Sequence, residues 1–160
     1  MLDGMTTPVL NTGRLWAGGA ATAVVAGLIA VAGILLGRGI FDVQVLAPKG
    51  AGVWGDASTG WYAAGAGAAA LVATGLIQLL ITTTPKPMRF FGWVIALATV
   101  VAMLAPFVTD ADRASRFYTA GLNFILGVAI GTLVAGVAKS ALRPAVLPPT
   151  VRPTPPPYYR

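Results

Sequence analysis

Four stretches of the chain combine bilayer length with an absence of charged side chains, at residues 15–37, 62–82, 90–109 and 119–138. An α-helix needs about 20 predominantly apolar residues to cross the roughly 30 Å of hydrocarbon in a membrane. Each stretch meets that length, and mostly short segments separate them. The sequence therefore predicts an all-α membrane protein, a four-transmembrane-helix bundle with short loops.

The composition agrees with lipid as the main solvent. Hydrophobic residues make up 56% of the 160 residues and charged residues 10%, whereas soluble domains carry about 25% charged residues. The net charge of +6 would indicate nucleic acid in a soluble protein, but here the basic residues stand near the ends of the apolar stretches. We therefore expect membrane lipids, and no nucleic acid, as partners.

The chain lacks the residues that most enzymes and metal sites use. It has no cysteine and no histidine, so thiolate nucleophiles, imidazole bases and the usual soft metal ligands are excluded. No catalytic, cofactor-binding or metal-binding residue is predicted. The five acidic residues all lie outside the four stretches, at Asp3, Asp42, Asp56, Asp110 and Asp112.

The first stretch must be weighed against a cleaved signal peptide. The letters AVAG at residues 30–33 resemble a signal-peptidase site, but apolar residues continue through Leu36. Such a run is too long for an ordinary signal core. We expect a retained helix.

The segment TTTPKPMRFFGW, residues 82–93, predicts a tight turn between the second and third spans. Pro85 and Pro87 cannot continue a helix and bias the residues before them to extended geometry. Lys86 and Arg89 resist translocation across the membrane. This turn is therefore expected on the cytoplasmic face.

The distribution of basic residues orients the whole chain, because lysine and arginine accumulate on the cytoplasmic side. An even number of spans places both termini on one side, with seven basic residues against four on the other. The seven are Arg14, Lys86, Arg89, Lys139, Arg143, Arg152 and Arg160, and the four are Arg38, Lys49, Arg113 and Arg116. We predict a multi-pass protein of the plasma membrane with both termini cytoplasmic. Anionic lipid headgroups are expected at Arg14, Lys86, Arg89, Lys139 and Arg143.

Two segments flank or interrupt the membrane domain. Residues 38–61 form the longest loop, in which IFDVQVL, residues 40–46, alternates apolar and polar residues and predicts a short strand within a small outer cap. Seven of the twelve prolines lie at the C-terminal end, so residues 144–160 are expected to form a disordered, extended cytoplasmic tail. The chain then divides into an N-terminal cytoplasmic segment 1–14, a membrane domain 15–143 and the tail.

Small residues mark the expected helix contacts, because helices in lipid associate through close backbone packing. Gly127, Gly131 and Ala135 form a stripe at intervals of four on the fourth span, and Gly33 and Gly37 form a shorter one on the first. The second span carries small side chains, mostly alanine and glycine, on nearly all sides. We expect it to be buried among its neighbours.

Polar residues inside the spans are the usual functional candidates, and three of them stand out here, with Thr22 a weaker fourth. Thr74 and Gln78 share a face of the second span, and Asn123 lies near the outer end of the fourth. Hydrogen bonds between helices suffice to explain all three. The alternative is that they line a path for a solute.

Three segments carry a resemblance to a known family: FDVQV after the first span, RFFGWVIALATVVAMLAP in the third and AGLNFILGVAIGTLV in the fourth. In these and in the order of its spans the chain resembles an uncharacterised actinobacterial family of four-span membrane proteins with a domain of unknown function. The resemblance implies a location and a shape, and no activity, substrate or cofactor.

These observations favour a non-catalytic integral membrane protein, either an accessory or structural subunit of a cell-envelope complex or a self-associating one that uses the fourth-span stripe. A small oligomeric channel or carrier is the alternative. A membrane enzyme built on Asp110 and Asp112 or on the loop acids Asp42 and Asp56 is more remote, because no base or metal ligand set accompanies them.

Overall fold

The computed structural model describes residues 9–48 and 54–143, and its architecture confirms the predicted four-helix membrane bundle. The long helices are α1 (Thr12–Gly39), α2 (Thr59–Thr83), α3 (Pro87–Leu104) and α4 (Arg113–Ala141). A short 3-10 helix, η1 (Ala105–Val108), extends α3. The described residues also form four short strands, β1 (Val9–Leu10), β2 (Leu46–Pro48), β3 (Trp54–Asp56) and β4 (Leu142–Arg143). The four expected spans lie within these helices, except that η1 ends one residue before Thr109.

Local sequence signals explain where the helices begin and end. The side chain of Asn11 accepts a hydrogen bond from the Arg14 backbone N–H at 3.0 Å and caps α1, and Asp112 caps α4 in the same way through Ala114. Pro87 occupies the first turn of α3, where its missing N–H costs nothing. Pro106 falls in η1, where the α-helical pattern gives way to the exit from the third span.

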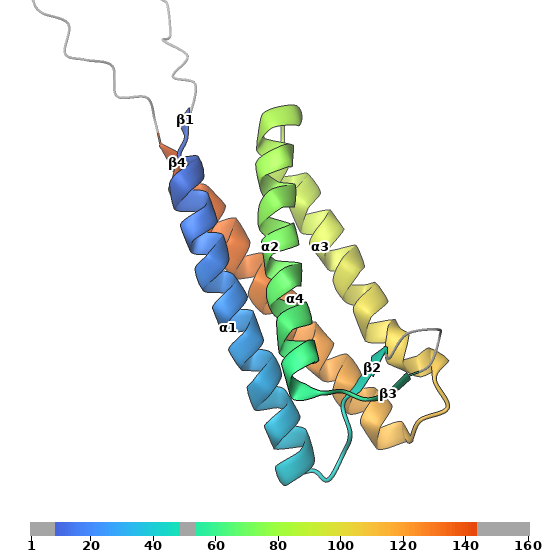
Figure 1. The fold of residues 1–160 in the computed structure, drawn as a ribbon. Helices are drawn as coiled ribbons and strands as arrows, with labels where there is room; N and C mark the ends of the chain where they lie inside the picture. The colour runs from blue at the N-terminus through green and yellow to red at the C-terminus, as the bar shows by residue number, and fades with distance from the viewer. Residues whose placement is uncertain (1–8, 49–53, 144–160) are drawn as a thin grey trace, which may run out of the picture.

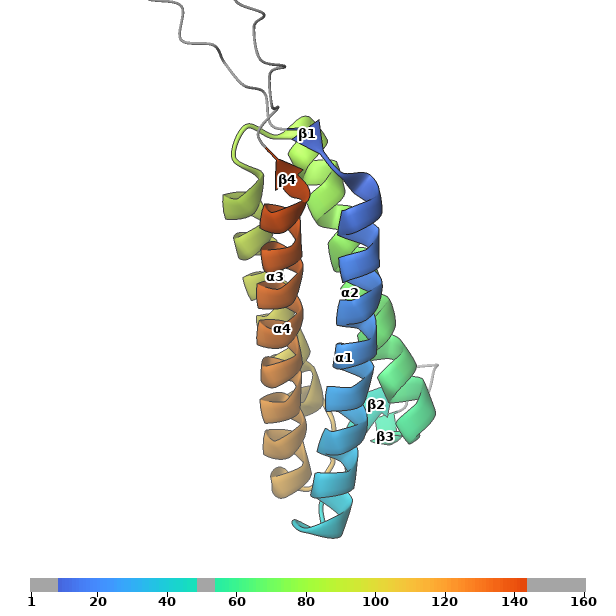
Figure 2. The same cartoon turned by 90° about the vertical axis from the view of Figure 1, so that its left-hand side faces the viewer.

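The two ends of the bundle differ in what they carry (Figure 1). At one end, here called the terminal end, β1 pairs antiparallel with β4 (Val9 with Arg143), and the turn between α2 and α3 lies near them. At the other end, here called the loop end, β2 pairs antiparallel with β3. The segment that connects η1 to α4 lies at this end too. Figure 2 shows α1 and α4 side by side along their length. The two helices run antiparallel.

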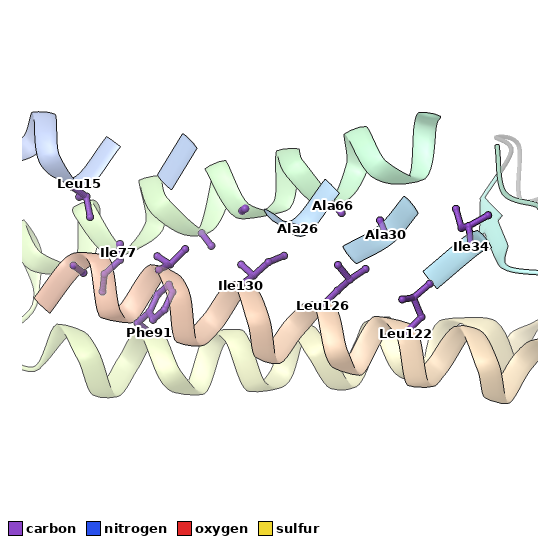
Figure 3. Packing of buried hydrophobic residues seen from close by; sticks show 14 of the residues in the cluster. Leu15, Ala26, Ala30, Ile34, Ala66, Ile77, Phe91, Leu122, Leu126 and Ile130 are labelled. Atoms are coloured by element: carbon purple, nitrogen blue, oxygen red, sulfur yellow. The ribbon is translucent and has the colours of Figure 1, made fainter. Parts of the chain in front are cut away.

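The core lies between α1, α2 and α4. Buried residues of α4 recur at Leu122, Leu126, Ile130 and Val134, one stripe of the helix, and Figure 3 shows three of them pointing toward α1 and α2. α3 contributes only one buried side chain, Phe91. Ile95 and Thr99 are partly buried against α4, and the outer face of α3 is exposed within the chain.

The β2–β3 hairpin forms the small cap expected at the loop end. The backbone N–H of Leu46 donates to Oγ1 of Thr119 at 3.0 Å, and that of Gln44 donates to Oγ of Ser115 at 3.3 Å, so α4 holds the loop by side-chain acceptors. The expected strand lies further along the chain. β2 begins at Leu46, the last residue of IFDVQVL, and just before it the carbonyl oxygen of Val45 accepts a hydrogen bond of 2.7 Å from the backbone N–H of Ala57. The alternation in that segment reflects the buried side chain of Val45 and its exposed polar neighbours.

The second span is less buried than its composition predicts. Ala66, Ala70 and Ala73 are covered, but Gly65, Ala68, Ala69 and Val72 are exposed within the chain. These four follow one another at helical spacing and form one face of α2. Part of that face borders the site described next.

Candidate functional site

A groove runs between α2 and α3, with α4 as its floor. Its volume is about 1270 Å³, which exceeds the roughly 300 to 1000 Å³ of common ligand pockets. The residues that line it are Arg38, Ala47, Asp56, Ala57, Ser58, Trp61, Tyr62, Gly65, Ala66, Ala69, Val72, Ala73, Leu76, Val94, Ile95, Ala98, Thr99, Ala102, Asn123, Leu126, Gly127 and Ile130.

Small residues make the walls of the groove. Gly65 and Ala69 on α2 face Ala98 on α3, so little side-chain volume fills the space between the two helices. A Cβ at Gly65 would meet nothing within 4 Å. The rim residues Val72 and Val94 are 72% and 41% exposed, so the groove opens sideways, where a bilayer would supply lipid.

The polar groups of the groove gather at its loop end. The Nη2 atom of Arg38, in the last turn of α1, lies 2.8 Å from both carboxylate oxygens of Asp56 and 2.6 Å from the carbonyl oxygen of Ala57, and it donates to all three. The ion pair is open to solvent, with the two side chains 41% and 40% exposed. Among the described residues, Nη1 and Nε of Arg38 make no hydrogen bond. Nη2 is therefore held in place, while the N–H groups of Nη1 and Nε have no partner among the described residues.

One hydrogen-bonded chain crosses the groove near the same end. The Tyr62 hydroxyl donates to Oδ1 of Asn123 at 2.5 Å, and Nδ2 of Asn123 donates to the carbonyl oxygen of Ala102 at 2.7 Å. The three residues belong to α2, α4 and α3. Asn123 therefore joins the two walls of the groove to its floor.

The spacing of charges along α1 gives the depth of this polar end. Arg14 and Arg38 are 24 residues apart on one helix, a distance of about 36 Å at 1.5 Å per residue, and no charged residue lies between them. That exceeds the roughly 30 Å of bilayer hydrocarbon and stays within the roughly 40 to 45 Å that includes the headgroups. When Arg14 lies at one headgroup layer, Arg38 lies at the other.

The predicted packing glycines are placed between helices of the same chain. A Cβ at Gly127 would meet the side chain of Thr99, and one at Gly131 would lie 2.8 Å from Cγ2 of Ile95, so α3 fills the fourth-span stripe. Ala135, the next residue of the stripe, packs partly buried against the core. On α1, Gly33 faces Leu122 and Gly37 faces Tyr118, both on α4. The stripe considered for self-association is thus occupied within the molecule.

The three intramembrane polar residues have separate partners. Thr74 is fully buried, donates to the carbonyl oxygen of Ala70 and packs against Gly19. Oε1 of Gln78 accepts a hydrogen bond from Nε1 of Trp16 at 2.7 Å, also between α2 and α1. Asn123 lies in the groove, on the other side of α2. The structure therefore does not bring the three together along one path.

The basic residues predicted to meet lipid headgroups belong to the terminal end. Arg14, Lys86, Arg89 and Lys139 are exposed there, on α1, the α2–α3 turn, α3 and α4. Arg143 pairs with Val9 through its backbone, and its side chain lies outside the described part. The basic tail residues 152 and 160 also lie outside it. No three acids of the described residues gather as a metal site.

Sequence reasoning missed the groove and its polar end. Arg38 was interpreted as one of the basic residues at the span ends, and Asp56 as one of several loop acids. The ion pair joins residues 18 apart and the Tyr62–Asn123 bond joins residues 61 apart. A signal was present in the second span, whose glycines and alanines leave a helix face without bulk.

The comparisons with known proteins identify a family and no activity. A model described as a family of unknown function, DUF6069, matches residues 10–140, which covers the four helices up to the next-to-last residue of α4. No curated protein and no solved structure matches the chain.

Proposed function

The chain belongs to the DUF6069 family, whose function is unknown, and we propose from its geometry that it is a non-catalytic, lipid-binding accessory subunit of the plasma membrane. The lateral groove between α2 and α3 is the observation that carries this proposal. A groove open to the bilayer is filled by hydrocarbon, because leaving its walls bare would forfeit their dispersion contacts.

The dimensions of the groove match one leaflet. Along α2 it extends from Trp61 to Leu76, 15 residues or about 22 Å, and one leaflet with its headgroup layer is about 20 to 22 Å thick. An acyl chain entering from the loop end would therefore fit along its length. A polar solute would find partners only at that end, beside Arg38 and Asn123.

The structural roles of three aspartates support a binding function for the protein over an enzymatic one. Asp56 pairs with Arg38, and Asp112 caps α4. Asp42 adopts a positive φ of 50° in the loop after α1, a conformation that aspartate tolerates better than most residues. Each of these acids thus has a structural role that accounts for its position.

We further propose a larger envelope complex as the setting, with both termini cytoplasmic. Self-association through the α4 stripe loses support, because α3 fills that stripe. The exposed small residues of α2, among them Ala64 and Ala68, would let another helix approach closely.

Lipid retention in matched variants tests the groove. Gly65→Leu places a side chain in the groove, whereas Gly75→Leu adds the same side chain to α2 at a position outside its lining; a Cβ at either glycine meets nothing within 4 Å. Native mass spectrometry of the full chain, released from nanodiscs, should find a retained lipid in the wild type and in Gly75→Leu, and much less in Gly65→Leu. Equal retention in all three would contradict the proposal.

The accessory role has its own test. Affinity purification of the native complex in mild detergent, followed by mass spectrometry, should return a membrane partner in fixed ratio. Recovery of the chain alone would count against a larger complex while leaving lipid binding in place.

A further inference from the structure

We propose that the lipid held in the groove is a phospholipid, and that Arg38 binds its phosphate. This inference rests on the proposed function, since it concerns the same groove. It adds the chemical class of the ligand and the residue that selects it.

The walls of the groove supply little selectivity. In a bilayer an acyl chain leaves other acyl chains to enter the groove, so burial against alanine and leucine brings no hydrophobic gain of the kind that operates in water. Any preference among lipids must therefore come from the polar end. The charged groups there are Arg38 and Asp56.

Arg38 has the geometry for a phosphate. Its Nη2 is fixed by Asp56 and by the carbonyl oxygen of Ala57, which orients the guanidinium plane. The Nη1 and Nε atoms make no hydrogen bond among the described residues, so three N–H donors remain that can each donate singly to a phosphate oxygen. The side chain is 41% exposed, so a headgroup can reach it.

The depth of Arg38 agrees with this assignment. Its separation from Arg14 along α1 places it at the headgroup layer opposite the terminal end, as argued above. A lipid whose chain follows α2 and α3 into the groove would thus carry its phosphate to the level of Arg38. Under the proposed orientation this is the outer leaflet.

Asp56 sets the strength of the interaction. Its carboxylate pairs with Arg38 and offsets part of the positive charge that a phosphate would meet. Removing the carboxylate charge should therefore strengthen phosphate binding. If the ion pair only supports the fold, removing the carboxylate charge should instead weaken lipid binding, because loss of either partner would then disturb the groove equally.

Competition among lipids with identical acyl chains tests the inference. The full-length protein in nanodiscs is offered phosphatidylglycerol, phosphatidylcholine and diacylglycerol, and native mass spectrometry counts what remains bound. Charge-assisted hydrogen bonds of about 1.5 to 3 kcal/mol correspond to a preference of about tenfold or more for both phospholipids over diacylglycerol. Inorganic phosphate at millimolar concentration should not displace them.

Three variants assign the preference to Arg38. Arg38→Gln should lose it, Asp56→Asn should keep or raise it, and Arg113→Gln, which removes the same charge at the same end outside the groove, should leave it unchanged. If Arg38→Gln does not fold, Arg38→Lys keeps the charge but replaces the separate guanidinium N–H donors by one ammonium group, and it should weaken the preference.

Several results would overturn the inference. The wild type could retain diacylglycerol as well as it retains the phospholipids, or inorganic phosphate could displace the bound phospholipid. The preference for phospholipids over diacylglycerol could also be lost in Asp56→Asn or in Arg113→Gln. The proposed function fails separately, when the wild type retains no lipid of any class.

Discussion

Tyr62 and Asn123, 61 residues apart in the chain, are joined by a hydrogen bond of 2.5 Å from the tyrosine hydroxyl to the amide oxygen. The amide nitrogen of Asn123 completes the link to α3 through the carbonyl oxygen of Ala102. This single asparagine therefore connects three helices at the polar end of the groove. Its two bonds fix how far α2 and α3 stand apart there.

Replacing Tyr62 by phenylalanine removes the donor and keeps the ring. Polar contacts between membrane helices contribute about 0.6 kcal/mol on average and at most about 1.7 kcal/mol. We expect Tyr62→Phe to lower the free energy of unfolding by an amount in that range, measured by SDS titration of the protein in detergent micelles.

A double-mutant cycle with Asn123→Ala isolates the bond itself. The two substitutions should be less than additive, because each alone already breaks the Tyr62–Asn123 contact. Full additivity would show that the two residues contribute independently.

Gly127 is predicted to tolerate no side chain. A Cβ there would collide with the side chain of Thr99 on α3, and overpacking of this kind costs about 1 to 3 kcal/mol. Gly127→Ala should therefore reduce the free energy of unfolding by that amount in the same titration. Gly136→Ala, on the same helix where a Cβ meets nothing within 4 Å, is the matched control and should be neutral or slightly stabilising.

Thr119 holds the β2–β3 hairpin to α4. Thr119→Val keeps the shape but leaves the buried backbone N–H of Leu46 without its acceptor, which costs about 1 to 3 kcal/mol. Amide hydrogen exchange should quicken in the hairpin and stay unchanged in α1. Thr132→Val, at an exposed threonine that bonds only to its own helix, should leave exchange in the hairpin unaltered.

The chain has no native cysteine, so single cysteines can report its orientation. Thr83→Cys lies at the terminal end and Asp110→Cys at the loop end, and both positions are exposed. A maleimide that cannot cross membranes should label Asp110→Cys on intact cells and label Thr83→Cys only after the membrane is opened. The opposite pattern would invert the orientation argued from the basic residues.

The helices could be predicted from sequence because their signals are local. A run of about 20 apolar residues identifies a membrane span without reference to any other part of the chain, and asparagine, aspartate and proline mark the ends near Asn11, Asp112 and Pro87. For the same reason the short strand expected in IFDVQVL was displaced, since β2 begins only at Leu46. Of the alternating apolar side chains Val45 is buried and Phe41 is 60% exposed, because alternation shows neither which side chains the rest of the chain covers nor which backbone groups have a pairing partner.

The groove could not be predicted because it depends on how α2, α3 and α4 are arranged. Gly65 and Ala69 give a helix a bare face in any arrangement, and the sequence does not state whether another helix covers it. Small residues were read as a mark of burial, which holds for Ala66 and Ala70 and fails for their exposed neighbours. The position of Arg38 beside this face follows only from the path of the loop that carries Asp56.

The pairing of β1 with β4 has a consequence for how the bundle is assembled during synthesis. Its two strands are the first and last described segments of the chain, so the contact between Val9 and Arg143 cannot form until translation has passed α4. α1 and α2 can pair as a hairpin as soon as both have left the translocon, whereas the flank of α1 that faces α4 must wait for the final helix. A ribosome stalled before residue 113 would thus leave an inserted but open intermediate, with Gly33 and Gly37 available to quality-control factors that recognise unassembled helices.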